Sequence, residues 1–264
     1  MSRRPIALLS FPWDASSSYA RGAALGPPVI RALLASDIST DYSLSGVKIS
    51  GVIARHVEPA LSENAAAARA QITETVAAAL ADGLKPLSLG GDHSITYPIL
   101  KAMKAAHGPL NILQIDAHTD LYDELGGDRY SHACPFARAI EDGLVGNLVQ
   151  VGLRSVGPAE RAFGEKHGVV MLGAEAWTEI PYERLTAPLY VTIDLDGLDP
   201  AFAPGVSHPE PGGLSTREVL AILSTLPAAP AGADITELNP AKDANLLTAH
   251  VAVRLVKELA ALMA

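Results

Sequence analysis

Residues 189–200 read Leu-Tyr-Val-Thr-Ile-Asp-Leu-Asp-Gly-Leu-Asp-Pro, a short apolar run that ends abruptly in acidic residues. An unbroken apolar run of this length is typical of a strand that is buried on both faces of a parallel sheet. We therefore expect a strand over 189–193, with Asp194 and Asp196 just beyond its carboxyl end. In an open α/β sheet, ligands bind beside the carboxyl ends of the strands. This stretch thus predicts both a parallel sheet and a polar site at its edge.

Further short apolar runs alternate with helical patterns along the whole chain. Ile72, Val76 and Leu80 recur at four-residue spacing, which predicts a helix that stops at Gly83. Such alternation indicates a three-layer α/β/α fold with a mainly parallel sheet of about eight strands, in one domain over residues 1–264. The other expected elements are strands at 6–9, 48–53, 86–89, 111–115, 148–152, 169–172 and 231–235, and helices at 62–82, after Ser215 and at about 246–263.

The composition limits the class of protein. Of the 264 residues, 48% are hydrophobic and 19% are charged, which excludes a disordered chain. A formal net charge of −9 argues against a surface for nucleic acid or anionic membranes. No apolar run approaches the roughly 18 residues of a membrane span. The single cysteine, Cys134, excludes a disulfide framework and fits a reducing compartment, so we expect a cytoplasmic protein.

Acidic residues and histidines gather behind four of the expected strands. These strands end at Leu89, Ile115, Ile193 and Ile235. Because the carboxyl ends of parallel strands share one edge of the sheet, the polar clusters behind them should converge on one crevice. A lone aspartate after a strand usually caps a turn, and this is the plain interpretation of Asp92. The clusters are Gly90-Gly91-Asp92-His93-Ser94, Asp116-Ala117-His118-Thr119-Asp120, Asp194-Leu195-Asp196-Gly197-Leu198-Asp199-Pro200 and Thr236-Glu237-Leu238-Asn239-Pro240.

Several carboxylates in one crevice need positive charge nearby, because like charges in a partly dry site repel one another. Two divalent cations would balance four carboxylates, and in an extended segment residues i, i+2 and i+4 point the same way. Carboxylates and imidazoles without a thiolate favour Mn²⁺ over structural zinc, and Co²⁺ or Ni²⁺ fits the same donors. A water between two metals about 3.5–4 Å apart becomes acidic enough to supply hydroxide at neutral pH. The expected metal ligands are His93, Asp116, His118, Asp120, Asp194 and Asp196.

These clusters resemble the motifs of the ureohydrolase family, which includes arginases and agmatinases. The resemblance implies an arginase-like fold, a binuclear manganese centre at the six residues above, and hydrolysis of a guanidino group to urea and an amine by a metal-bridging hydroxide. It also implies a homo-oligomer, either a trimer or a hexamer. The resemblance covers nearly the whole chain, because it includes Pro204-Gly205 and Pro211-Gly212-Gly213, and near the start Asp14, Arg21-Gly22-Ala23, Gly26-Pro27 and Ile30-Arg31.

Two further residues stand where this family keeps functional groups. His132 corresponds to the catalytic histidine, and a histidine can protonate a leaving amine because it titrates near neutral pH. Glu237 corresponds to the carboxylate that orients the guanidinium, whose forked donors pair with carboxylates. Asp194, near the attacking hydroxide, is the third candidate catalytic residue. An exposed loop histidine and a helix-capping glutamate are the alternatives for His132 and Glu237.

The choice of guanidino substrate depends on the residues around its tail. Agmatine ends in an ammonium group, whereas arginine also carries a carboxylate. Tyr122 stands where animal-type arginases have an asparagine, and Glu210 lies in a loop that resembles agmatinases, so both favour agmatine, with putrescine as product. Arg129 and Tyr130 could instead contact a carboxylate, and 205–215 also resembles plant-type enzymes, which include arginases. We expect agmatine first, L-arginine second and another guanidino acid third.

Two other functions fit parts of the pattern. A metal-binding partner subunit without turnover would keep the ligands, but His132 and Glu237 would then be free to change. A metal-dependent deacetylase shares the broad fold and uses one zinc, whereas the two ligand sets here indicate two metals. A metal count near two per chain would favour a ureohydrolase of arginine or polyamine metabolism that acts on small molecules.

Overall fold

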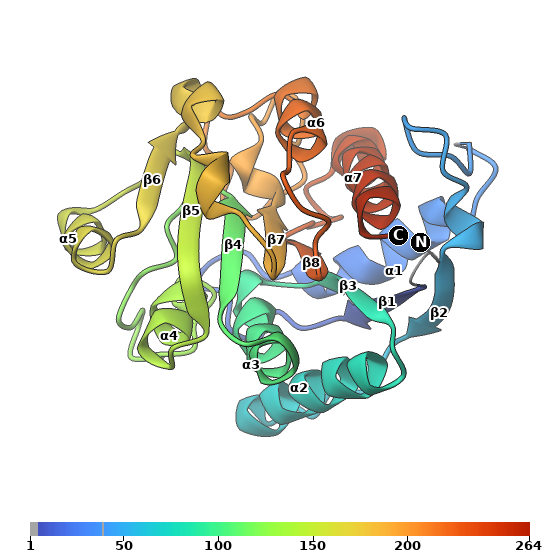
Figure 1. Ribbon diagram of the computed structural model, residues 1–264. Helices are drawn as coiled ribbons and strands as arrows, with labels where there is room; N and C mark the ends of the chain where they lie inside the picture. Colours follow the sequence, from blue (N-terminus) through green and yellow to red (C-terminus); the bar gives the residue numbers. More distant parts are fainter. Residues whose placement is uncertain (1–4, 39) are drawn as a thin grey trace.

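The computed structural model describes residues 5–38 and 40–264, and a single eight-stranded sheet forms its centre (Figure 1). Every pair of neighbouring strands is parallel. The predicted three-layer fold with a sheet of about eight strands is confirmed. In sheet order the strands are β2 (Ile53–Val57), β1 (Ile6–Phe11), β3 (Lys85–Gly90), β8 (Gly232–Thr236), β7 (Leu189–Asp194), β4 (Leu110–Ile115), β5 (Val145–Leu153) and β6 (Val170–Gly173).

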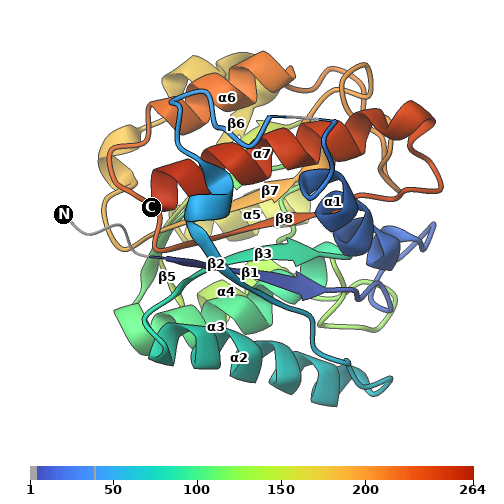
Figure 2. The ribbon, with the colours of Figure 1, turned by 90° about the vertical axis from the view of Figure 1, so that its right-hand side faces the viewer.

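Helices cover both faces of the sheet (Figure 2). One face carries α2 (Ala65–Ala81), α3 (Thr96–His107) and α4 (Pro135–Glu141), and the other carries α1 (Gly26–Leu34), α6 (Thr216–Ser224) and α7 (Leu247–Met263). The short helix α5 (Pro158–Lys166) lies beside the edge strand β6. Among the described residues, no helix combines the length and the apolar character that crossing a bilayer would require.

The sheet is buried because its strands are apolar on both sides. Along β7, Tyr190 packs into the core beneath α2 and α3, whereas Val191 and Ile193 pack into the core beneath α6 and α7. This alternation follows from the two-residue period of a strand. Two separate apolar layers therefore clamp the sheet and hold its central strands in a fixed register.

One predicted strand and several helices differ from the structure. The pattern in 48–53 predicts a strand, but Ile49–Gly51 form a 3-10 turn and β2 starts only at Ile53. The β2 strand lies at the edge of the sheet, so its exposed Arg55 and His56 give no apolar run. Helix α1 begins with Gly-Pro-Pro, which reads as a turn, although proline fits the first turn of a helix. Helices α1, α3, α4 and α5 lie outside the predicted ones.

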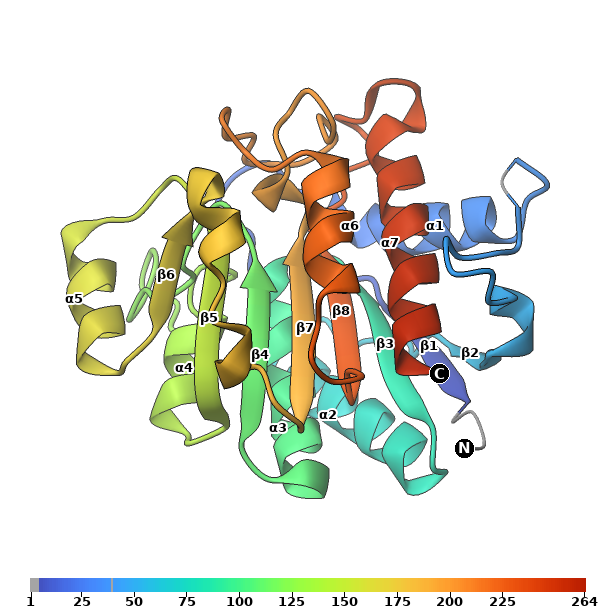
Figure 3. The same ribbon diagram turned by 45° about the horizontal axis from the view of Figure 1, so that its top comes forward.

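The strand ends that precede the four polar clusters stand side by side. Leu89 pairs with Ile235, Ile235 with Ile193, and Ile193 with Ile115. The corresponding strands β3, β8, β7 and β4 are consecutive in the sheet, and Figure 3 shows the long loops gathered beyond their carboxyl ends. The register of the sheet therefore brings the clusters to one place, as the sequence predicts.

Candidate metal centre and substrate pocket

Three aspartates surround one nitrogen of His93. Its Nδ1 lies 2.9 Å from Asp120 Oδ2, 3.2 Å from Asp116 Oδ2 and 3.3 Å from Asp194 Oδ2. The same nitrogen is buried and has no partner with hydrogen-bond geometry. Together, this buried nitrogen and the three carboxylate oxygens that it faces without a hydrogen bond form a set of ligand atoms for a cation. We call this cluster of His93, Asp116, Asp120 and Asp194 the inner position.

A second cluster shares one aspartate with the first. His118 Nδ1 lies 3.2 Å from Asp196 Oδ2 and 3.7 Å from Asp116 Oδ1. Asp116 therefore turns one oxygen toward His93 and the other toward His118, as a bridging carboxylate would. One ligand atom from each of Asp116, His118 and Asp196 lies within 4.8 Å of the others. We call this cluster the outer position, because 27% of the His118 side chain is exposed. All six predicted ligands thus lie together in two adjoining clusters.

The carboxyl groups of these clusters perturb one another. Burial, together with the charges of Asp196 and Asp116, raises the pKa of Asp194 well above its usual range. Burial and the charge of Asp116 raise the pKa of Asp120 to about 6. Burial lowers the pKa of His118, but its hydrogen bonds and charge contacts with Asp116 and Asp196 outweigh this and raise it to about 12. Such a cluster favours protons or cations, and two divalent cations would balance its four carboxylates.

Backbone geometry fixes the loops that carry these residues. Asp120 and Glu237 have positive φ angles of 52° and 66°, which non-glycine residues rarely adopt and which store strain at functional sites. Gly197 packs so closely that a Cβ atom there would lie 2.8 Å from the backbone nitrogen of Asp116. The ligand loops behind β4 and β7 are therefore in backbone contact. The Asp92 carboxylate caps the turn at His93 by accepting from Ser94 N at 3.1 Å, as its plain interpretation predicts.

His132 and Glu237 form a pair beside the inner position. His132 Nδ1 lies 3.1 Å from Glu237 Oε1, which also accepts from the backbone nitrogen of His93 at 3.0 Å. Ser18 places its backbone nitrogen 3.2 Å and its hydroxyl oxygen 2.8 Å from His132 Nε2. Because a backbone N–H can only donate, Nε2 acts as an acceptor and the ring proton sits on Nδ1, toward Glu237. The other carboxylate oxygen, Glu237 Oε2, is buried and has no hydrogen-bond partner.

The pair also sets the proton affinity of the imidazole. Burial lowers the pKa of His132, but the hydrogen bond and charge of Glu237 outweigh burial and raise it to about 9. Burial and the positive charge of His132 lower the pKa of His208, whose ring centre lies 5.1 Å away. His208 is therefore neutral near pH 7, whereas His132 can hold a second proton once Nε2 is free.

A cavity of about 210 Å³ opens above the two metal positions. No lysine or arginine is among the described residues that line it, and its only carboxylates belong to the metal clusters. Its remaining polar groups are hydroxyls and imidazoles. The lining residues are Ser18, His118, Asp120, Tyr122, Leu125, His132, Ala133, Ser155, Asp194, Asp196 and His208.

Only one of the three predicted tail-binding residues lies in this cavity. Tyr122 lines it, whereas Arg129 forms ion pairs with Asp123 and, at 3.1 Å, with Glu141. Glu210 does not line the cavity either, and its backbone oxygen accepts from Arg154 at 2.7 Å. Contrary to the prediction, Arg129 and Glu210 do not line this cavity; the partners of Arg129 come from a loop and from α4, and local sequence does not reveal them.

Sequence reasoning missed three polar residues of the cavity: Ser18, Ser155 and His208. Ser18 reaches the site because Ser16 N, two residues earlier, donates to Asp92 Oδ2 at 2.9 Å. His208 stands two residues before Glu210, in the loop that resembles agmatinases. The signal for it in the sequence is the histidine itself, placed between Ser207 and Pro209 in that loop.

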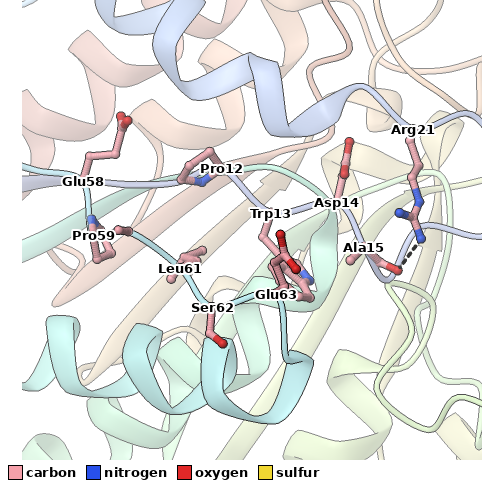
Figure 4. A pocket seen from close by; sticks show the side chains of 11 residues that line it. Pro12, Trp13, Asp14, Ala15, Arg21, Glu58, Pro59, Leu61, Ser62 and Glu63 are labelled. Carbon is pink, nitrogen blue, oxygen red and sulfur yellow. Dashed lines mark hydrogen bonds between the residues drawn. The ribbon is translucent and has the colours of Figure 1, made fainter.

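A larger cavity lies elsewhere and lacks the features of a catalytic site. It has a volume of about 640 Å³ and is lined by residues 12–15, Arg21 and 58–63 (Figure 4). Its charged groups are largely engaged within the fold. Asp14 accepts from Gly22 N at 2.7 Å, the Arg21 guanidinium donates to Ala15 O at 3.1 Å, and Glu58 pairs with Arg31.

Comparison with known proteins identifies the family. Residues 4–261 match the model of the arginase family. This chain belongs to the arginase family. It is 47% identical over 187 residues to mitochondrial arginase 1 of Arabidopsis thaliana, in an alignment that covers 67% of this chain and 55% of that protein. It is 32% identical to the mitochondrial agmatinase of Gallus gallus, over 96% of this chain and 79% of that protein. The solved arginase from Medicago truncatula superposes with a TM-score of 0.93 at 38% identity, over 98% of this chain and 87% of that chain.

Membership of the arginase family confirms the resemblance seen in the sequence. It supports a metal-dependent amidinohydrolase that acts on small guanidino molecules. It does not support the expected preference for agmatine, because a plant arginase is the more similar of the two relatives. The expected trimer or hexamer stays a prediction. So does the cytoplasmic location, since both relatives are named as mitochondrial proteins.

Proposed function

We propose that this chain hydrolyses L-arginine to L-ornithine and urea. The observation that carries the guanidinium end of this proposal is the buried, unpartnered Oε2 of Glu237 beside the two metal clusters. A buried carboxylate oxygen without a donor costs free energy unless a ligand supplies one. A guanidinium is planar and carries N–H donors in a fork, so it matches this acceptor.

The six clustered residues fit two divalent cations, and manganese suits their oxygen-rich donor set. His93, Asp116, Asp120 and Asp194 would hold the inner ion, and Asp116, His118 and Asp196 would hold the outer one. When bound, the two ions supply water activated for attack at neutral pH. Asp194, a residue of the inner position, is the third catalytic candidate beside His132 and Glu237.

The residues of the chain itself bind the guanidinium and move protons. Glu237 uses Oε2 to orient the substrate, while Oε1 holds His132 in place. His132 Nε2 is the atom that carries a proton to the leaving amine. To do so it must exchange its contact with Ser18 for one with the substrate, and the raised pKa favours proton uptake at that moment.

The cavity wall favours a tail that ends in a carboxylate. Ser18, Ser155 and His208 offer hydrogen bonds, and an α-carboxylate accepts such bonds. Agmatine has no carboxylate to accept these bonds, and Glu210, the acid expected to favour its ammonium, does not line the cavity. The greater similarity to a plant arginase than to an agmatinase also supports L-arginine.

The test compares urea release by manganese-loaded enzyme from L-arginine, agmatine and a guanidino acid without an α-amino group. We expect the highest kcat/KM for L-arginine. The variant His208→Ala should lower that value roughly tenfold, the equivalent of about 1.4 kcal/mol of lost hydrogen bonding. The matched control Arg129→Ala should stay within about twofold, because Arg129 lies outside the cavity.

Each alternative has its own outcome. Faster turnover of agmatine would overturn the proposed substrate and restore the order expected from sequence. Release of urea from none of the three compounds, with two ions bound, would overturn the proposed activity and favour a metal-binding partner subunit.

A further inference from the structure

A fully buried carboxylate, Asp234, lies in the middle of the sheet behind the metal centre. It is on β8 with none of its surface exposed. Three hydroxyl groups, two from β7 and one from α3, donate to it. They are Thr192 Oγ1 at 2.6 Å, Tyr190 OH at 2.7 Å and Thr96 Oγ1 at 2.9 Å. None of the proton movements proposed above uses this carboxylate, although burying it is costly.

One of the three hydroxyls connects Asp234 to a metal ligand. Thr192 Oγ1 lies 2.9 Å from His93 Nε2. A hydroxyl has one hydrogen, and here that hydrogen goes to Asp234 Oδ1. The Thr192 oxygen can therefore only accept from His93, so Nε2 carries the ring proton. The lone pair is left on Nδ1, which is the atom that faces the three aspartates of the inner position.

The direction of this chain of hydrogen bonds depends on an acceptor at its far end. An ionised carboxylate can only accept, so it orients every hydroxyl around it. Burial raises the pKa of Asp234 above its usual value, and the hydroxyl donors offset only part of that rise. Phe136 packs edge-on against the His93 ring, with 5.4 Å between ring centres, and limits its rotation. The ring is thus held by packing, while its tautomer is set from the sheet.

We propose that Asp234 is a positioning residue that acts through Thr192 to present His93 Nδ1 to the metal ion at the inner position. This proposal rests on one part of the proposed function, namely that the two clusters bind two divalent ions. Metal-ligating histidines commonly donate their second N–H to a fixed acceptor, and loss of that acceptor weakens metal binding roughly 10–100-fold. Here a threonine extends the link by one hydrogen bond, which lets the carboxylate stay inside the sheet.

The test measures Mn²⁺ affinity by calorimetry and by metal content after dialysis against a chelator, without substrate. Thr192→Val keeps the side-chain shape but removes the link, and should weaken one of the two ions roughly 10–100-fold. Thr192→Ser keeps the hydroxyl and should restore binding to within about threefold of the wild type. Tyr190→Phe is the matched control, because it removes another donor of the same carboxylate without touching His93.

A specific role and a merely structural one give different results. Equal loss of Mn²⁺ affinity in Thr192→Val and Tyr190→Phe would overturn the proposal, because any disturbance of the buried network would then suffice. Asp234→Asn removes the obligatory acceptor and should weaken the same ion as Thr192→Val. If Asp234→Asn folds and binds both ions as the wild type does, Asp234 has no positioning role. Because no readout requires urea release, failure of the proposed function leaves this test intact.

Discussion

The metal clusters and the wall of the substrate cavity are built in different ways. The six metal ligands follow β3, β4 and β7, which lie with β8 among four adjacent strands in register, and the loops behind β4 and β7 touch backbone to backbone. The wall comes from segments around residues 18, 122–133, 155 and 208, none of which belongs to a strand of the sheet. Contacts between these segments help to hold them, such as the hydrogen bond from His132 N to Ser16 O at 3.2 Å. The comparison shows that the sheet positions the metal ligands, while the loops determine which substrate fits.

We expect the largest loss of activity from a substitution in the metal clusters. Asp194→Asn removes one charged ligand of the inner position, so the manganese content should fall from two ions toward one per chain. Turnover should fall at least about a thousandfold, because removal of one partner leaves other buried charges uncompensated. Metal analysis and urea release measure the two effects.

Asp199→Asn is the control for this prediction, since Asp199 follows the same strand but only caps a turn. Its carboxylate accepts from Ala201 N at 2.8 Å and from the backbone nitrogens of Gly212 and Gly213. We expect this variant to keep two ions. An Asp194→Asn enzyme with two ions and full turnover would remove Asp194 from the ligand set.

We expect a smaller effect, on turnover alone, from a substitution of His132, which lies between the metal clusters and the cavity wall. His132→Asn should lower kcat by roughly 10²–10⁴ while both ions stay bound, because it removes a proton donor and no ligand. The pKa of His132 is raised to about 9, so once Nε2 leaves Ser18 the ring holds a second proton below that pH and loses it above that pH. We therefore expect wild-type kcat to decline as pH rises through about 9, and the decline to disappear in His132→Asn. Unchanged kcat in the variant would contradict the role.

The smallest effect on activity is expected beneath the wall, at Cys134. This thiol is fully buried two residues from His132, and burial together with the charge of Asp120 raises its pKa to about 12. Only the thiolate reacts with alkylating reagents, so native protein at pH 8 should label roughly a thousandfold more slowly than a free cysteine. Mass spectrometry of iodoacetamide-treated protein measures the rate, with urea-unfolded protein as control. Rapid native labelling with loss of activity would contradict this prediction and show that the wall opens to expose a reactive Cys134.

The same difference between the two regions explains what could be predicted from the sequence. Each metal ligand lies within five residues after an apolar run, so a local pattern locates it and the register of the sheet brings the ligands together. Arg129 has no such pattern, because its partners Asp123 and Glu141 come from a loop and a helix. The sequence does not point to Asp234 for the opposite reason, since it lies within an expected strand, where apolar spacing is the signal and a polar residue carries none. Its partners come from residues 96, 190 and 192, and only the folded sheet brings them together.

The close contact between Gly197 and the backbone of Asp116 also defines where the sequence can change length. Neither ligand loop can gain an atom there without displacing the other, so insertions are confined to segments away from this contact. Residues 122–131 of the wall meet no such limit, because they are mostly exposed and a Cβ at Gly126 or Gly127 would meet no atom within 4 Å. Gly197 therefore separates the part of the chain that must keep its length from the part that can be replaced. Wall loops from an arginase-family relative with another substrate could be grafted onto this chain, while the loops that carry the metal ligands stay unchanged.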